Sequence, residues 1–299
     1  MEVLGARVTA ASQGRVVGSR DVVSTPVLAK ADDENFSVAP LFLPRRIRAH
    51  MLALYGFARL VDDLGDEAEG DRLALLDWAE TELDRAAAGQ ATHPIFLRLT
   101  PTIRTCELDL EPFRDLIQAN RIDQTVHAYA TFDDLLGYCA LSANPVGRLV
   151  LAVLDMATPE RVRWSDDVCS ALQVAEHCQD VAEDAAQGRV YLPAADLAYF
   201  GCDLADLHTP VASPALRGVL RLEVGRARGL LASSVPLAAS LHGRARFLIA
   251  GFAAGGAAAL DAIEANGFDV MARPCPPSKA RRVTRTLRLL MAAKEARPR

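Results

Sequence analysis

Residues 173–184, QVAEHCQDVAED, decide how this chain folds. Within them Gln173, Glu176, Asp180 and Asp184 recur at intervals of three or four, so they share one face of a helix. Alanine and valine lie beside them, and three acids on such a face repel one another unless a cation joins them. Mg²⁺ prefers oxygen ligands and is commonly completed by water and substrate phosphates. The stretch therefore predicts a helix that turns a magnesium-binding face toward a cavity.

A second acidic cluster, DDLGDE at residues 62–67, lies far earlier in the chain. Asp62 and Asp66 are four residues apart, and Arg59 precedes Asp62 by three, so all three share a helical face. Taken alone, this segment has two readings. The acids bind metal and Arg59 binds a diphosphate, or the acids form a solvated helix end with Arg59 as their salt-bridge partner. If the two acidic faces lie opposite each other, they can hold magnesium ions and a diphosphate between them.

A third element is YCALSANPVGR at residues 138–148, inside an apolar helical stretch. Pro145 has no N–H to donate to the carbonyl of Leu141, so a kink is expected there. Ser142 and Asn144 would then form a polar notch in an apolar wall. A bent core helix without any chemical role is the alternative.

Composition indicates an all-α protein. Hydrophobic residues make up 51% of the chain, aromatics only 6%, and no stretch alternates with the period of two that a half-buried strand needs. Residues 1–31 lack periodic apolar content and are expected to form a loose tail, followed by one helical domain over 32–299. Glycine and proline divide that domain into expected helices at 45–67, 71–88, 94–107, 112–124, 132–155, 159–187, 213–242, 244–267 and 278–295.

Several function classes are excluded at this point. A net charge of −5 gives no reason to expect a nucleic-acid partner. The six cysteines lack CxxC spacing and read as thiols of a reducing compartment. The N-terminal residues have no sustained apolar stretch typical of a signal peptide, and the apolar run at 247–260 is short for a membrane span. We expect a cytoplasmic protein that contacts membranes only peripherally.

These motifs together resemble the squalene/phytoene synthase family, over a region from about Asn35 to Lys279. The resemblance rests on ENF at 34–36, YGFARLVDDLGDE, YCALSANPVGR, LQVAEHCQDVAEDAAQGRVYLP and PPSKAR. The SANPVGR and QDVAED segments are most similar to the hydroxysqualene synthase type. Other members commonly have VAG-x-VG in place of SANPVG, asparagine at the position of Glu176, and arginine at that of Gln179.

The resemblance implies a single-domain isoprenoid synthase fold, all-α, with helices around a central apolar cavity. It implies that about two or three Mg²⁺ ions bind to the carboxylates of both boxes. These metal ligands would be Asp62, Asp66, Glu176, Asp180 and Asp184. Residues expected to contact the substrate are Asn35, Tyr55, Arg59, Gln173 and Arg189. Tyr138 would lie near the reacting carbons, and we expect Asn144, in the notch, to position a water molecule.

The implied reaction is Mg²⁺-dependent ionisation of presqualene diphosphate, followed by rearrangement and capture of water to give hydroxysqualene and diphosphate, within squalene and hopanoid biosynthesis. No hydride is needed, and the sequence has no GxGxxG fingerprint after a strand, so NADPH is not expected. The alternative within the family is condensation of two farnesyl diphosphates to presqualene diphosphate or squalene. From other classes, a helical binding protein without turnover stays open, whereas a di-iron bundle lacks its Glu-x-x-His pairs. The expected partners are the prenyl diphosphate substrate, the membrane surface as a peripheral contact, and other enzymes of the squalene pathway that pass on substrate or product.

Overall fold

The structure, a computed structural model, describes residues 39–271 and 276–297. The first described helix begins at Arg45 and the last ends at Glu295. The expected tail over 1–31 and the expected substrate contact Asn35 lie outside the described residues.

The all-α prediction is confirmed. The described residues form helices and no strand, and an isolated bridge joins Ala128 to Val190. The helices are α2 (Arg45–Asp66), α3 (Arg72–Ala87), α4 (Pro94–Thr105), α5 (Glu111–Ile122), α6 (Phe132–Ser142), α7 (Asn144–Val153), α8 (Pro159–Gln179), α9 (Val181–Ala186), α10 (Ala194–Phe200), the 3₁₀ helix η2 (Leu204–His208), α11 (Pro214–Leu231), α12 (Ser234–Ser240), α13 (Gly243–Ala265) and α14 (Lys279–Glu295).

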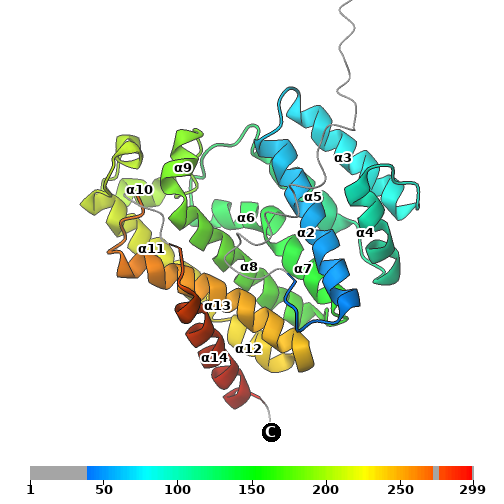
Figure 1. The fold of residues 1–299 in the computed structure, drawn as a ribbon. Coiled ribbons are helices and arrows are strands. Elements are labelled where there is room, and N and C mark those ends of the chain that lie inside the picture. Colours follow the sequence, from blue (N-terminus) through cyan, green and yellow to red (C-terminus); the bar gives the residue numbers. More distant parts are fainter. Residues whose placement is uncertain (1–38, 272–275, 298–299) are drawn as a thin grey trace, which may run out of the picture.

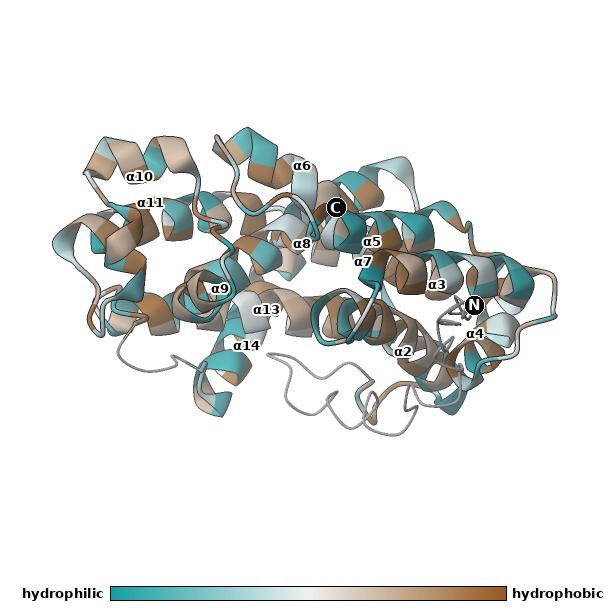
Figure 2. Cartoon of the chain, turned by 90° about the horizontal axis from the view of Figure 1, so that it is seen from above, coloured by the Kyte–Doolittle hydropathy of each residue, from teal (hydrophilic) through white to brown (hydrophobic). Residues whose placement is uncertain are grey.

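Helix α8 occupies the middle of the molecule (Figure 1). It packs against α6, α7, α11, α12 and α13, while α2 packs against α3, α4, α5 and α7. Most helices carry both hydrophobic and hydrophilic residues along their length (Figure 2), as expected for helices with one buried stripe. In the core the ring of Phe57 contacts Phe96 and Phe113 edge to face, with ring centroids 5.8 and 5.0 Å away.

Local signals place the helix that carries the second acidic cluster. Thr158 adopts an extended conformation and its hydroxyl accepts a hydrogen bond from the backbone N–H of Arg161 at 3.3 Å. Pro159 occupies the first helical position, where the missing N–H has no cost. This start is the one the sequence predicts.

Three helices expected to be continuous are divided in the structure. The expected helix 132–155 breaks at Ala143, two residues before Pro145, because the proline cannot donate to the carbonyl of Leu141. The expected helix 159–187 breaks at Asp180, whose φ of −102° and ψ of 16° leave the helical region. The expected helix 213–242 is interrupted at residues 232–233, and the short helix α10 is absent from the prediction.

Two helical segments are long and apolar enough to cross a membrane, the Phe132–Val153 region and α13. More than half of each apolar window is buried inside the protein, 56% and 61% respectively. Their apolar residues therefore serve the interior of this fold, which is the ordinary role of core helices.

Candidate active site

Two adjoining cavities occupy the space between α2 and α8. The polar chamber has a volume of about 600 Å³ and is lined by the acidic cluster of α2 and by the second acidic cluster, which runs from the end of α8 into α9. The apolar chamber has a volume of about 310 Å³ and is lined mainly by residues of α2, α7, α8 and α13. The two chambers share the lining residues Arg59, Asp62, Leu116, Ser142, Gln173 and Glu176. They form one continuous site with a charged end and a hydrocarbon-like end.

The structure brings most of the expected site residues to this site. Tyr55 lines the apolar chamber, and Asn144 lines neither chamber. The expected residues that line the polar chamber are Arg59, Asp62, Asp66, Tyr138, Gln173, Glu176, Asp180, Asp184 and Arg189.

Asp62 is the carboxylate at the boundary of the two chambers. Its Oδ1 accepts a hydrogen bond from Asn120 Nδ2 at 3.2 Å. The side chain is reached by water within the chamber, yet protein surrounds it on most sides, and this desolvation raises its pKa to about 7; the neighbouring charge of Asp66 adds to the rise. Gly65 makes room for Asn120, because a Cβ at position 65 would overlap the asparagine side chain. Asn120 was not anticipated from the sequence, because its role depends on a contact between distant helices.

Arg59 forms salt bridges with two acids that follow it closely in the chain. Its Nε lies 2.8 Å from Asp63 Oδ1 and its Nη2 lies 3.1 Å from Glu67 Oε1. The side chain still lines both chambers. Arg59 therefore has the local salt-bridge partners of one reading, while its role toward a diphosphate stays a prediction.

The second acidic cluster faces the same chamber. Burial raises the pKa of Asp180 to about 6, with a further rise from the charge of Glu183. Burial also raises the pKa of Asp184 to about 7, and the charge of Asp180 adds to it. A raised pKa means that the charged form of each carboxylate is destabilised. A cation in the chamber would stabilise the charged form of both.

Arg189 connects the two acidic clusters. Its Nη2 donates to Asp66 Oδ1 at 2.7 Å, and its side chain is only 12% exposed. Its charge also lowers the pKa of Asp184, opposing the effect of burial. The glycine at position 188 has a φ of 78°, a turn that ends the helical segment and returns the chain toward the chamber. From the sequence, Arg189 was expected only as a substrate contact; its partner on the first cluster is a finding of the structure.

An aromatic cluster forms the wall beside the acids. Tyr138 and Tyr191 both donate to Asp123, at 2.7 and 3.3 Å. His177 stacks on Tyr191 with ring centroids 3.8 Å apart, and burial lowers the pKa of His177 to about 3. Val190 N–H donates to the His127 carbonyl at 2.7 Å, which fixes the segment that carries Tyr191. Of these residues only Tyr138 was expected at the site from the sequence. The positions of Asp123 and Tyr191 depend on contacts between segments that are distant in the sequence.

The kink between α6 and α7 differs from the expected notch. The side chain of Asn144 is buried, and its Oδ1 accepts a hydrogen bond from Ser170 Oγ at 3.0 Å. Asn144 was expected to position a water molecule; its amide oxygen already has a protein partner, Ser170 on α8, and its side chain lines neither chamber. Ser142 instead lines both chambers, and its Oγ is buried without a hydrogen-bond partner in the structure.

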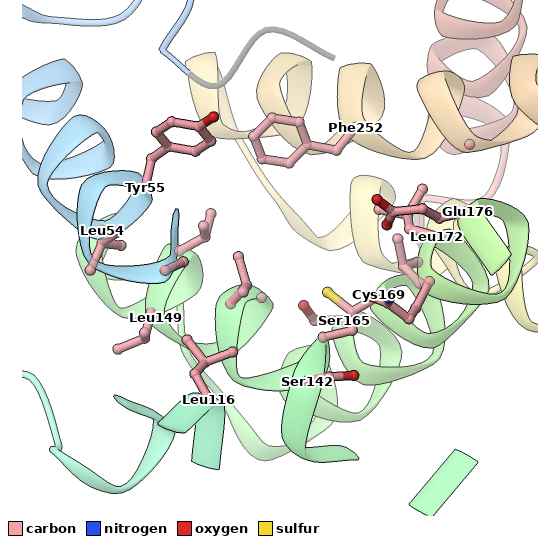
Figure 3. A pocket seen from close by; sticks show the side chains of 18 of the residues that line it. Leu54, Tyr55, Leu116, Ser142, Leu149, Ser165, Cys169, Leu172, Glu176 and Phe252 are labelled. Carbon is pink, nitrogen blue, oxygen red and sulfur yellow. The ribbon is translucent and has the colours of Figure 1, made fainter. Parts of the chain in front are cut away.

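The apolar chamber is shaped by rings and by small residues. The rings of Tyr55, from α2, and Phe252, from α13, point toward each other at one end of it (Figure 3). Gly147 on α7 and Gly256 on α13 line the chamber, and a Cβ at either position would overlap side chains of α8. The glycines therefore allow α7 and α13 to lie close to α8. The chamber wall at these positions carries no polar side chain of α7 or α13.

The polar chamber suits a divalent cation by its donor set. Asp62 on α2, Asp180 between α8 and α9, and Asp184 on α9 have raised pKa values, and Asp180 repels Asp184; a cation would relieve both effects. In the described part of the chain, no three His, Cys, Asp or Glu side chains are arranged to hold an ion by themselves. Mg²⁺ fits such an open arrangement, because water and phosphate oxygens usually complete its coordination.

Comparisons with known proteins identify the family of the chain. The profile of the squalene/phytoene synthase family matches residues 29–288. The chain is 36% identical to a hydroxysqualene synthase from Rhodopseudomonas palustris, over 70% of this chain and 72% of that protein. It is 32% identical to a phytoene synthase from Arthrospira platensis, over 79% and 82%. It is similar in structure to squalene synthase HpnC from Alicyclobacillus acidocaldarius, with a TM-score of 0.75 and 48% identity over 81% of this chain and 92% of that one.

A helical fold around adjoining polar and apolar chambers is that of an isoprenoid synthase. The chain belongs to the squalene/phytoene synthase family, whose members process prenyl diphosphates.

Proposed function

We propose that the chain is a hydroxysqualene synthase, which converts presqualene diphosphate and water to hydroxysqualene and diphosphate in squalene and hopanoid biosynthesis. The observation that carries the proposal is the junction of a carboxylate-lined chamber and an apolar chamber, with a buried unpartnered hydroxyl, Ser142, in their shared wall. The relatives named hydroxysqualene synthase support it.

The carboxylates of both clusters provide the cation site in this proposal. The residues that would hold Mg²⁺ are Asp62, Asp66, Glu176, Asp180 and Asp184. Magnesium bound there would neutralise charge on the diphosphate and fix its position. Arg189 and Arg59 line the same chamber and would donate to diphosphate oxygens.

The first step breaks the carbon–oxygen bond of the substrate, and both bonding electrons leave with the diphosphate. Arg59 and Arg189 stabilise the charge that develops on the leaving group. The cation that remains lies against the rings of Tyr138, Tyr55 and Phe252, whose faces attract positive charge. The apolar walls exclude stray water while the cation rearranges.

The second step admits one water molecule. We assign its position to Ser142, because a buried hydroxyl without a protein partner requires a hydrogen bond from water or substrate. The water oxygen forms the new carbon–oxygen bond, and the released proton passes to the diphosphate. No hydride donor enters this reaction, in contrast to the reduction that leads to squalene.

The alternative function is condensation of two farnesyl diphosphates, and the relatives named phytoene synthase support a condensing role. Incubation with presqualene diphosphate and Mg²⁺ without NADPH, followed by mass spectrometry, separates the two. Hydroxysqualene with an oxygen from ¹⁸O-labelled water is the expected product. Turnover of farnesyl diphosphate alone, with presqualene diphosphate left unchanged, would refute the proposal and establish the alternative.

A further inference from the structure

Helix α14, the last described helix, presents an apolar stripe to solvent. Val283, Leu287 and Met291 are spaced four residues apart, so they lie along one side of the helix. They are 60%, 57% and 58% exposed. The opposite side packs against α12 and α13, with Ala293 fully buried and Leu289 against the core. One side of α14 is therefore buried by packing, while the stripe of Val283, Leu287 and Met291 stays exposed.

Basic residues accompany this stripe. Residues 279–295 contain six lysines and arginines against one acid, Glu295, although the whole chain has a net charge of −5. Arg285 faces inward, where its Nε donates to Asp261 Oδ2 at 2.6 Å. Arg288 and Lys294 are exposed, and no ion pair is found for either within the described residues. The outward side of α14 thus combines three apolar side chains with cations that the fold does not neutralise.

We propose that the outer face of α14 docks on the surface of an anionic lipid bilayer. A helix with a basic polar face and exposed apolar side chains is suited to lie in the membrane interface, where acyl chains accept the apolar stripe and anionic headgroups attract the cations. A polyanion such as RNA would match the charges, but it would leave Val283, Leu287 and Met291 in water. A second copy docked through the same face would bring two strongly basic helices together.

Docking through α14 would bring the apolar chamber close to the bilayer. Helix α13 separates α14 from the apolar chamber, since α13 contributes Ile249, Phe252, Gly256 and Ala259 to the chamber lining. Docking through α14 would hold the hydrocarbon end of the site one helix away from the bilayer (Figure 1). Binding to lipid in this way requires no substrate and does not depend on which prenyl diphosphate reacts.

Vesicle sedimentation of the full chain tests the proposal, with phosphatidylcholine vesicles that contain or lack phosphatidylglycerol. We expect sedimentation with the anionic vesicles and about tenfold weaker or no binding to the neutral ones, with loss at high salt. Leu287→Glu should lower the apparent affinity at least about tenfold. Leu97→Glu on α4 is the matched control, because Leu97 is 53% exposed in a helix far from α14 in sequence, and this variant should bind like the wild type.

Charge is tested separately by Arg288→Glu, with Arg98→Glu on α4 as its control; both arginines are exposed. Circular dichroism and thermal melting verify that each variant is folded. Equal sedimentation of Leu287→Glu and Leu97→Glu would overturn the proposal, as would an absence of wild-type binding to anionic vesicles. A dimer that Leu287→Glu converts to a monomer, without vesicle binding, would assign the face to a second copy. Binding to poly(U) but not to vesicles would assign it to nucleic acid.

Discussion

The polar and apolar chambers share a wall but are built by different means. Acids and arginines that are widely separated in the sequence line the polar chamber, where burial raises carboxylate pKa values to about 6 or 7. Small and aliphatic residues line the apolar chamber, whose shape depends on the close approach of α7 and α13 to α8. Under the proposed function, the polar chamber would govern departure of the diphosphate, and the apolar chamber with the shared wall would govern what becomes of the carbon chain.

Loss of a carboxylate from the polar chamber should have the largest effect. Asp62→Asn and Asp180→Asn should each lower the rate of diphosphate release about 100-fold or more, because each removes charge that a cation requires. EDTA should abolish turnover and added Mg²⁺ should restore it. Steady-state diphosphate release measures the rate, and far-UV circular dichroism verifies the fold. Wild-type rates in either variant at saturating substrate would contradict the metal assignment.

Changes at the boundary should alter products more than rate. Ser142→Ala should shift the ratio of hydroxysqualene to eliminated hydrocarbons about fivefold, the equivalent of one hydrogen bond of about 1 kcal/mol. Diphosphate release should change less, since the polar chamber remains intact. Gas chromatography with mass spectrometry gives the ratio.

Two controls make this result specific. Ser165→Ala removes a hydroxyl that lines the apolar chamber and hydrogen-bonds with Cys169, so it should keep the wild-type product ratio. Asn144→Ala should lower stability by about 1 kcal/mol through loss of the Ser170 contact, again without a change in products. An altered ratio in Asn144→Ala with an unchanged ratio in Ser142→Ala would return the water site to Asn144.

The polar chamber should also make stability depend on pH and Mg²⁺. The folded pKa values of Asp62 and Asp184, about 7, lie above the unfolded value of about 4. The folded protein therefore binds more protons between about pH 4 and 7, and these acids lower its stability as the pH rises through that window. Mg²⁺ at 100 times its Kd should add about 2.7 kcal/mol above pH 7 and much less near pH 5. Thermal melting at both pH values, with Asp62→Asn as control, measures this; an equal Mg²⁺ effect at both would contradict it.

Removal of the N-terminal segment should have the smallest effect. Residues 1–31 lack periodic apolar content, so deletion of residues 1–30 should leave helicity and turnover nearly unchanged. Circular dichroism and steady-state kinetics of the shortened chain provide the measurement. A marked fall of the melting temperature would show that this segment stabilises the helical domain.

The two helix breaks at the site show which features of a helix local sequence can predict. A kink at Pro145 was expected within one continuous helix, because a missing backbone N–H is a property of the residue itself. The break at Asp180 was not, since residues 173–184 contain neither glycine nor proline and read as one helix. Asp180 keeps its backbone hydrogen bonds, donating to Glu176 and accepting from Asp184, so a missing donor does not explain this bend.

The sequence by itself determined the all-α class, most helix bounds and the two acidic faces, because these depend on spacing, capping and proline chemistry within one turn of helix. Only the tertiary structure decided which polar groups meet. Asn120 supports Asp62, Arg189 reaches Asp66, and Ser170 satisfies Asn144 so that Ser142 faces the chambers instead. Such contacts depend on how helices distant in sequence pack together, and periodicity along one helix carries no information about its neighbour.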